Sequence, residues 1–342
     1  MRNISALFIF VCFFSSCRQK SAVHPSFYFW KTKYQQNKLE ISYLERFKSK
    51  SLFVRIMDVD FNPDLQQAVP VSPINFLDPV PEALDIIPVV FIVNQVFTKL
   101  DATQRAAMAG RIATFVSAKV KQAGKSDFTA LQIDCDWTRT TRDNYFDFLE
   151  HLKAHPLLRG KMLSVTLRLH HVKNIASSGI PPVEKAMLMC YNMGNLRKYG
   201  AQNSILDEQQ MNLYLKDDLE HYPLKLDVAL PIFEWAVVFR NQKYAGISRR
   251  VNKALLQDKK IFRQRAGNSI LYDLLVDHPA AGLKVGDVVR WEEITREDLL
   301  TTSKFLSRHL KPEERNLVFY DLDADLLKHF TNDELKEVIA NF

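Results

Sequence analysis

Two carboxylates two residues apart are the first candidates for chemistry in this sequence. Asp134 and Asp136 come at the end of the apolar run Ala130-Leu-Gln-Ile-Asp-Cys-Asp-Trp-Thr138. In a β-strand this spacing puts both side chains on one face. If the strand belongs to a parallel barrel, that face is the interior, and the acids lie near the rim where barrel enzymes carry their active sites. The alternative is a solvated pair where a strand meets a loop.

Eight largely apolar segments could be the strands that position such residues. They lie at 24–30, 51–60, 86–94, 130–138, 162–170, 187–193, 225–235 and 316–323. Helical spacing follows several of them, at 101–124, 142–154 and 207–221 and from Thr295 and Thr331 onwards. This alternation predicts an α/β fold, a (β/α)8 TIM-type barrel. No Gly-rich phosphate loop follows a strand, which argues against a dinucleotide-binding sheet.

The domain organisation expected for residues 24–342 is a single barrel with one insertion. Residues 236–291, after the seventh strand, are too many for a simple connection and include short strand-like runs with Gly turns. The formal net charge of the 342-residue chain is +7, but its Lys and Arg residues alternate with acids. That pattern does not predict nucleic-acid binding.

The N-terminus has the pattern of an export signal. A basic start precedes an apolar core that is too short to span a membrane, so residues 1–16 are a predicted signal peptide. The ending Phe14-Ser-Ser-Cys17 resembles a bacterial lipobox, which implies a lipid on Cys17 and a tether over 17–23. We therefore expect an extracytoplasmic protein, lipid-anchored to a membrane of the bacterial cell envelope. Cleavage nearby without lipidation is the alternative.

The two remaining cysteines outside the signal region are not expected to pair. Cys135 and Cys190 lie in the fourth and sixth predicted strands, roughly 9 to 10 Å apart if one strand separates them. A disulfide needs a shorter Cα separation. No cysteine or histidine cluster has the spacing of a zinc site, so neither a metal nor another cofactor is expected.

Three strand ends together resemble the chitinase-type glycoside hydrolases of family 18. Ile133-Asp-Cys-Asp-Trp137 is similar to the family's fourth-strand signature, Met189-Cys-Tyr-Asn192 to its sixth-strand motif, and Ala229-Leu-Pro-Ile-Phe233 to its seventh-strand run. The resemblance covers residues 130–235 and implies a (β/α)8 barrel that acts on or binds glycans. The chain also resembles uncharacterised bacterial lipoproteins built on such barrels, which implies no activity.

The sequence departs from that family at the residue that matters most. The family signature ends in a Glu that protonates the leaving oxygen, and Thr138 stands there. A hydroxyl is too weak an acid to replace a carboxyl with a raised pKa. The resemblance still implies that Asp136 would orient a substrate N-acetyl group and that Tyr191 would help to hold it.

Three functions stay open from the sequence. In the first, the barrel mouth binds an oligosaccharide or polysaccharide without cleaving it, through Trp30, Asp134, Asp136, Arg168, Tyr191, Asn192, Trp235 and Tyr320. In the second, Glu234 replaces the missing acid and works with Asp136 in an atypical glycoside hydrolase. In the third, the protein is a non-catalytic envelope scaffold. His170 with Asp58 or Asp60 could instead serve another hydrolysis or bind a metal.

Overall fold

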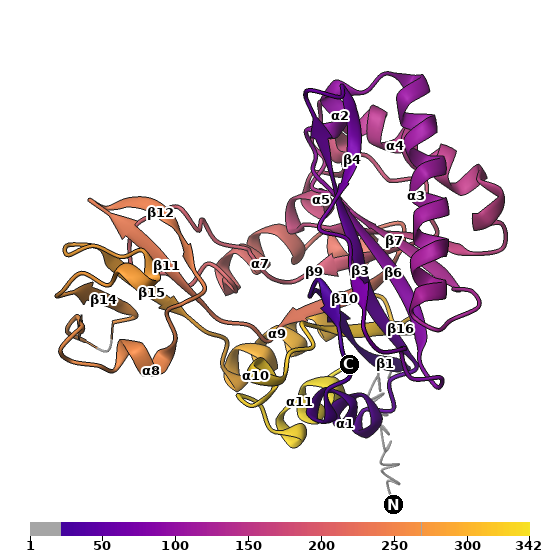
Figure 1. Cartoon of the computed structure of the whole chain (residues 1–342). Helices are drawn as coiled ribbons and strands as arrows, with labels where there is room; N and C mark the ends of the chain where they lie inside the picture. The colour runs from indigo at the N-terminus through magenta and orange to yellow at the C-terminus, as the bar shows by residue number, and fades with distance from the viewer. Residues whose placement is uncertain (1–21, 268) are drawn as a thin grey trace, which may run out of the picture.

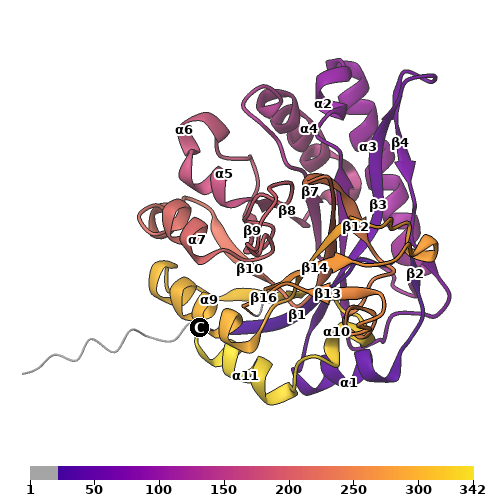
Figure 2. The same cartoon turned by 90° about the vertical axis from the view of Figure 1, so that its left-hand side faces the viewer.

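Eight parallel strands close into a barrel ringed by helices (Figures 1 and 2). The computed structural model describes residues 22–267 and 269–342, so the predicted signal peptide and Cys17 lie outside the described residues. The barrel order is β1-β16-β10-β9-β8-β7-β6-β3, and the pairing of β3 with β1 closes it. The strands are β1 (Val23–Phe29), β3 (Ser51–Asn62), β6 (Asp85–Ile92), β7 (Ala130–Asp134), β8 (Met162–Leu167), β9 (Lys185–Met189), β10 (Lys225–Pro231) and β16 (Arg315–Tyr320). The predicted (β/α)8 barrel is confirmed.

Polar side chains link strands inside the largely apolar barrel. The Tyr28 hydroxyl donates a hydrogen bond of 2.5 Å to the Gln132 amide oxygen, and the Thr166 hydroxyl donates one of 2.6 Å to Asp134. All four residues are buried. Since buried polar groups need partners, these bonds allow β7 to carry Gln132 and Asp134 among otherwise apolar neighbours.

The helices begin largely where the sequence predicts. They are α1 (Lys38–Arg46), α2 (Val96–Lys99), α3 (Ala102–Gln122), α4 (Arg142–Ala154), α5 (Leu169–Lys173), α6 (Ile175–Ser178), α7 (Glu208–Leu215), α9 (Arg296–His309), α10 (Ala324–Leu327) and α11 (Asn332–Ala340). Side chains of Asp101, Thr295 and Thr331 form capping boxes at the starts of α3, α9 and α11. None of the described helices is both long and apolar enough to cross a membrane.

Several predicted boundaries were wrong. The strands predicted over 130–138, 187–193 and 225–235 end at Asp134, Met189 and Pro231, so Asp136 lies after its strand rather than on it.

Two further boundaries differ because a new element begins. The strand predicted over 162–170 ends at Leu167, so His170 lies in α5 rather than on the inner face of a strand. The helix predicted over 207–221 ends at Leu215, and a separate 3-10 turn spans Leu219–His221. In both places the chain begins a short new turn where a single periodic element had been expected.

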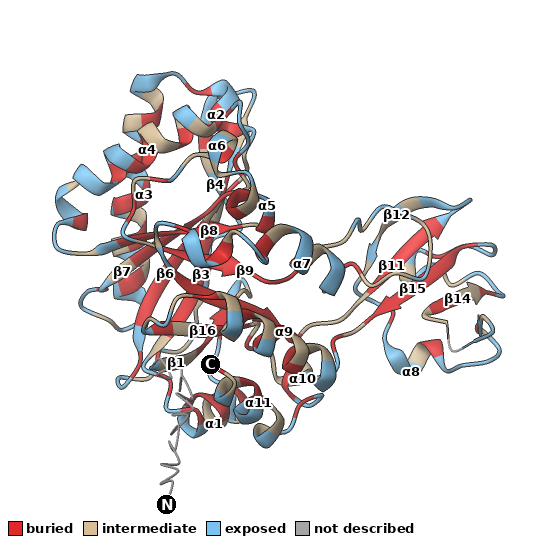
Figure 3. Ribbon diagram, turned by 180° about the vertical axis from the view of Figure 1, so that it is seen from behind, coloured by how far each residue is buried: buried red, intermediate tan, exposed pale blue. Residues whose placement is uncertain are grey.

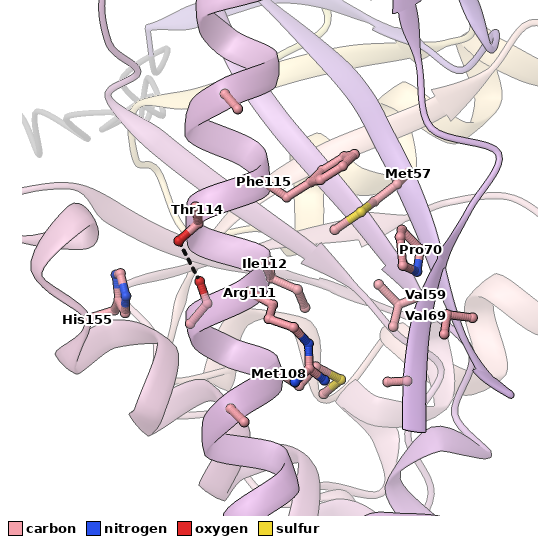
Figure 4. Close-up of a pocket in the computed structure, with 14 residues that line it drawn as sticks. Met57, Val59, Val69, Pro70, Met108, Arg111, Ile112, Thr114, Phe115 and His155 are labelled. Atoms are coloured by element: carbon pink, nitrogen blue, oxygen red, sulfur yellow. Dashed lines mark hydrogen bonds between the residues drawn. The ribbon is translucent and has the colours of Figure 1, made fainter. Parts of the chain in front are cut away.

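The second βα unit carries a hairpin where the other units carry helices. Between β3 and β6 the chain forms β4 (Gln67–Val71), which pairs antiparallel with β3, and β5 (Asn75–Phe76), which pairs with β2 (Lys33–Tyr34). An apolar cavity of about 740 Å³ lies between this hairpin and α3. Met57, Val59 and Pro70 on one side face Met108 and Phe115 of α3 on the other (Figure 4).

The chain between β10 and α9 forms a second lobe beside the barrel (Figure 1). Its antiparallel sheet has the order β12-β11-β15-β14-β13. The elements are β11 (Trp235–Arg240), β12 (Lys243–Ser248), α8 (Lys253–Leu256), β13 (Phe262–Gln264), β14 (Leu271–Leu274), a 3-10 turn (Pro279–Ala281) and β15 (Val288–Glu292). The lobe has an apolar core of its own, visible as buried segments of β11 and β15 in Figure 3.

A buried carboxylate joins this insertion to the barrel. Glu292 is fully buried and accepts hydrogen bonds from Arg290 at 2.5 Å, from the Trp235 indole at 3.0 Å and from the backbone N–H of Ser204 at 2.6 Å. Arg290 in turn donates to the carbonyl oxygens of Leu196 and Lys198. Because Ser204, Leu196 and Lys198 belong to the loop after β9, this cluster fixes the insertion against the barrel.

We predict that Glu292→Ala destabilises the protein far more than the neighbouring Glu293→Ala. Removing Glu292 leaves the Arg290 charge buried without its partner, which costs about 3–5 kcal/mol. Glu293 pairs with the more exposed Lys253, a contact worth about 1 kcal/mol or less. Urea unfolding of both variants measures the difference. Equal losses of unfolding free energy would contradict the role given to the buried cluster.

Candidate functional site

A cavity of about 980 Å³ opens at the carboxyl ends of the barrel strands. It brings together eight of the predicted site residues: Trp30, Asp134, Arg168, Tyr191, Asn192, Glu234, Trp235 and Tyr320. The insertion supplies part of the wall through residues of β12 and the following segment, including Ile247 and Arg249. Asp136 is not among the lining residues. The mouth is therefore a cleft between barrel and insertion.

An aromatic row crosses this cleft, with Tyr320 at its centre. The Tyr320 ring lies 5.5 Å from Trp30, 5.1 Å from Tyr191 and 5.7 Å from Phe233, measured between ring centroids. Phe233 continues the row to Trp235 at 5.1 Å. Tyr191 and Tyr320 are close to parallel, at 29°. These five residues, hereafter the aromatic row, come from four separate strand ends or the segments that follow them.

Asp136 is held by Arg168 from the adjacent strand end. The Arg168 Nε and Nη2 atoms donate to the two carboxylate oxygens at 2.7 and 3.0 Å, a two-pronged ion pair. Burial acts to raise the pKa of Asp136, but the hydrogen bonds and charge of Arg168 outweigh it and lower the pKa. Asp136 is thus a fixed anion, which suits binding better than proton transfer.

Three carboxyls that line the cleft have raised pKa values instead. Burial, with the charge of Asp136 adding to it, raises the pKa of Asp134 to about 6. Burial and the nearby Asp323 raise the pKa of Asp321 to about 7. Burial also raises the pKa of Glu234, against the pull of His329, whose Nδ1 atom lies 3.1 Å from the carboxylate. The cleft can therefore hold protons on carboxyls near neutral pH.

The chain leaves the cleft after Asp134, the last residue of β7. Trp137 is fully buried and stacks on His171 with ring centroids 3.7 Å apart. Thr138 is exposed, its hydroxyl bonded to those of Thr140 and Thr141. Thr138 therefore provides no acid to the cleft.

The structure does not group His170 with Asp58 or Asp60 into a hydrolytic or metal site. Asp58 forms an ion pair with Arg55 at 2.6 Å, and Asp60 is exposed on the β3 extension. His170 lines a separate side cavity of about 120 Å³. Among the described residues no group of three or more His, Cys, Asp or Glu side chains is placed to hold a metal ion. Cys135 and Cys190 are free and buried.

Sequence reasoning missed three residues of this site: Phe233, Asp321 and Arg249. Phe233 belongs to the run that resembles the family's seventh-strand motif, but it was not predicted to line the site. Asp321 lies two residues before Asp323, the same spacing as Asp134 and Asp136, so its place at a strand end was a usable signal. Arg249 gave no such signal, because it reaches the cleft only through the way the insertion folds over the mouth.

Comparisons with known proteins identify the fold. No family model matches the sequence, and no curated protein matches it. A chitinase from Chromobacterium violaceum superposes with a TM-score of 0.55 at 14% identity, over 93% of this chain and 99% of that one. This chain therefore shares the barrel fold of that chitinase structure.

Two further structures share this barrel fold. The spore cortex-lytic enzyme SleL of Bacillus megaterium gives a TM-score of 0.58 at 11% identity, over 95% of this chain and 75% of that one. A class V chitinase from Pseudomonas fluorescens gives 0.51 at 11% identity, over 92% and 99%. At such identities the likeness is one of fold, so the roles of the cleft residues rest on the geometry of this chain.

We predict that Asp134 makes the stability of this barrel fall as the pH rises from about 4 to about 6. The folded protein holds the Asp134 proton more tightly than the unfolded chain does, so stability is greatest below the unfolded pKa and is lost through the folded pKa. The full effect is about 3 kcal/mol. Urea unfolding of Asp134→Asn across this range should show the loss abolished.

Asp64→Asn, at an exposed turn, is the control and should follow the unmodified protein. A stability difference between Asp134→Asn and the unmodified protein that stays constant with pH would contradict the assignment.

Proposed function

We propose that the barrel mouth binds an oligosaccharide without cleaving it. The aromatic row is the observation that carries this proposal, because it lies along a cleft large enough for several sugar rings. Ligand sites are typically apolar and aromatic with a few fixed polar groups. Aromatic faces can stack against sugar rings, and the carboxylates of the cleft can accept hydrogen bonds from sugar hydroxyls.

The residues at positions 136 and 138 support binding rather than hydrolysis. Hydrolysis of a glycosidic bond needs an acid that protonates the leaving oxygen. Thr138 takes the position where the resembling family has that acid, and Asp136 is occupied by Arg168 through both oxygens. Arg168 lines the cleft whereas Asp136 does not, so this fixed ion pair offers the cleft hydrogen-bond donors and no transferable proton.

One observation favours a hydrolase as the second candidate. Glu234 lines the cleft and its pKa is raised by burial, as expected of a general acid. In that function Glu234 would protonate the leaving oxygen and Asp136 would orient the substrate. Its contact with His329 opposes this function, since a protonated imidazole favours the ionised carboxylate.

The open cleft argues against the third function, a non-catalytic envelope scaffold. A mouth plugged by the insertion would favour a protein-binding scaffold, whereas the insertion here forms a wall and leaves an open cavity. The structural neighbours include proteins named as chitinases, so chito-oligosaccharides are the first probes to try.

We predict that the protein lacking residues 1–17 binds chito-oligosaccharides and that Tyr320→Ala weakens this binding at least about thirtyfold, as expected for a central contact residue. The matched control is Tyr272→Ala, which removes a part-buried ring of the insertion outside the cleft. Calorimetric titration gives the affinities, and circular dichroism checks folding.

The same samples are assayed for release of reducing ends. Binding with no release supports the proposal. Release that is lost in Glu234→Gln but kept in Glu293→Gln would replace the binder with the hydrolase. Failure to bind any sugar on a glycan array would contradict both carbohydrate functions.

We also propose that the protein lies on the extracytoplasmic side of a bacterial membrane, anchored through a lipid on Cys17. It is supported by the signal-like pattern of residues 1–16 and the lipobox-like ending. We predict that Cys17→Ala abolishes labelling by a radioactive fatty acid and releases the protein from the membrane fraction, while Cys12→Ala retains both. Labelling that persists in Cys17→Ala would contradict the anchor.

A further inference from the structure

The positive charge of the chain is concentrated in the insertion. Residues 232–295, between β10 and α9, contain eleven Lys or Arg and seven Asp or Glu, a formal charge of +4 out of +7 for the whole chain. The rest of the chain, although much longer, carries the smaller share of the net charge. Such segregation gives one part of a protein a field that attracts anions.

Most acids of the insertion are already engaged. Glu292 is buried against Arg290, Asp287 pairs with Arg240 at 2.7 Å, and Asp273 pairs with Arg265 at 2.8 Å. Several exposed cations have no carboxylate within ion-pair distance among the described residues: Lys243, Arg249, Lys259, Lys260 and Lys284. The excess charge is thus available to an external anion.

Part of this basic surface borders the cleft. Arg249 follows β12 and lines the cavity together with Ile247, Ser248 and Asn252. Lys243 begins the same strand, which lies at the edge of the insertion sheet. Arg249 is therefore the insertion's basic residue at the cleft, and Lys243 lies outside it at the far end of β12, where only a ligand that extends along this strand reaches it.

The inner cleft has the opposite character. Five acids line it and outnumber two cations, Lys31 and Arg168, both of which are engaged by carboxylates. The acids are Asp58, Asp134, Glu234, Asp321 and Asp323. Anionic groups of a ligand are disfavoured beside these acids and favoured beside Arg249, whose guanidinium fork suits carboxylate and phosphate groups.

We infer that the glycan of this cleft is an acidic one, whose neutral sugar faces lie on the aromatic row and whose anionic groups contact the insertion through Arg249 and Lys243. The inference deepens the proposed function and rests on it. It assigns to the insertion the selection of ligand by charge.

A membrane surface is the other polyanion that such a basic lobe could meet, and the topology disfavours it. The chain enters the barrel at the amino end of β1, whereas the insertion follows the carboxyl end of β10. Because all eight strands are parallel, these points lie at opposite ends of the barrel. An anchor on Cys17 would hold the insertion away from its own membrane.

The test compares an acidic and a neutral oligomer of equal length, oligogalacturonate and chito-oligosaccharide, by calorimetric titration with the protein lacking residues 1–17. We expect tighter binding of the acidic oligomer and a preference that weakens at high salt. In the double variant K243E/R249E the ratio of the two affinities should fall about tenfold or more, as expected for the loss of charge-assisted contacts. The control R46E/K121E makes the same change of net charge on exposed residues of α1 and α3 and should keep the preference.

Equal affinity for the two oligomers, or the same loss in both double variants, would overturn this inference while leaving the glycan proposal in place. Binding to neither oligomer would overturn this inference, and failure to bind any sugar on the glycan array would overturn both. A sedimentation arm uses phosphatidylglycerol and phosphatidylcholine vesicles, and stronger binding to the anionic vesicles than to the acidic oligomer would assign the insertion to a membrane instead.

Discussion

Closure of the barrel by the pairing of β1 with β3 is the constraint on which the site depends. Tyr28 pairs with Phe53 and Phe29 with Val54, which joins the first strand to the second after the first has already paired with β16. Since all eight strands are parallel, closure brings their carboxyl ends to one rim. The aromatic row spans that rim from the end of β1 to the segment after β10. Trp30 meets Tyr320 because β1 also pairs with β16, where Phe27 pairs with Phe319, and closure holds these strands in one ring.

Two acids at the carboxyl end of β7, the last residue of the strand and the second residue after it, have different chemical characters because their surroundings differ. Asp134 points into the buried barrel interior, where desolvation favours its protonated form and a hydroxyl from Thr166 is its hydrogen-bond donor. Asp136, two residues on, meets the guanidinium of Arg168 and stays ionised. The pair therefore combines a proton-holding group with a fixed anion, and neither is placed like the acid that would follow Trp137 in the resembling family.

Much of the fold was predictable from the sequence because its signals are local. Apolar runs, capping residues and the spacing of Asp134 and Asp136 all act within a few residues. The cleft was only partly predictable, since its aromatic contacts join residues up to 290 positions apart, such as Trp30 and Tyr320. The pairing of Arg168 with Asp136 and the position of Arg249 depend on how separate elements pack, which no local pattern records. His170 was misplaced because an apolar alternation continued past the point where the strand ends.

The most direct test of glycan binding at the barrel mouth is a crystal structure of the protein lacking residues 1–17 with a chito-oligosaccharide or oligogalacturonate bound. The account predicts an intact oligosaccharide with a sugar ring stacked on Tyr320, between Trp30 and Phe233. Cleaved fragments in the cleft would contradict the non-hydrolytic function. An oligosaccharide bound only elsewhere, for example between α3 and the β3–β4 hairpin, would contradict the assignment of the site.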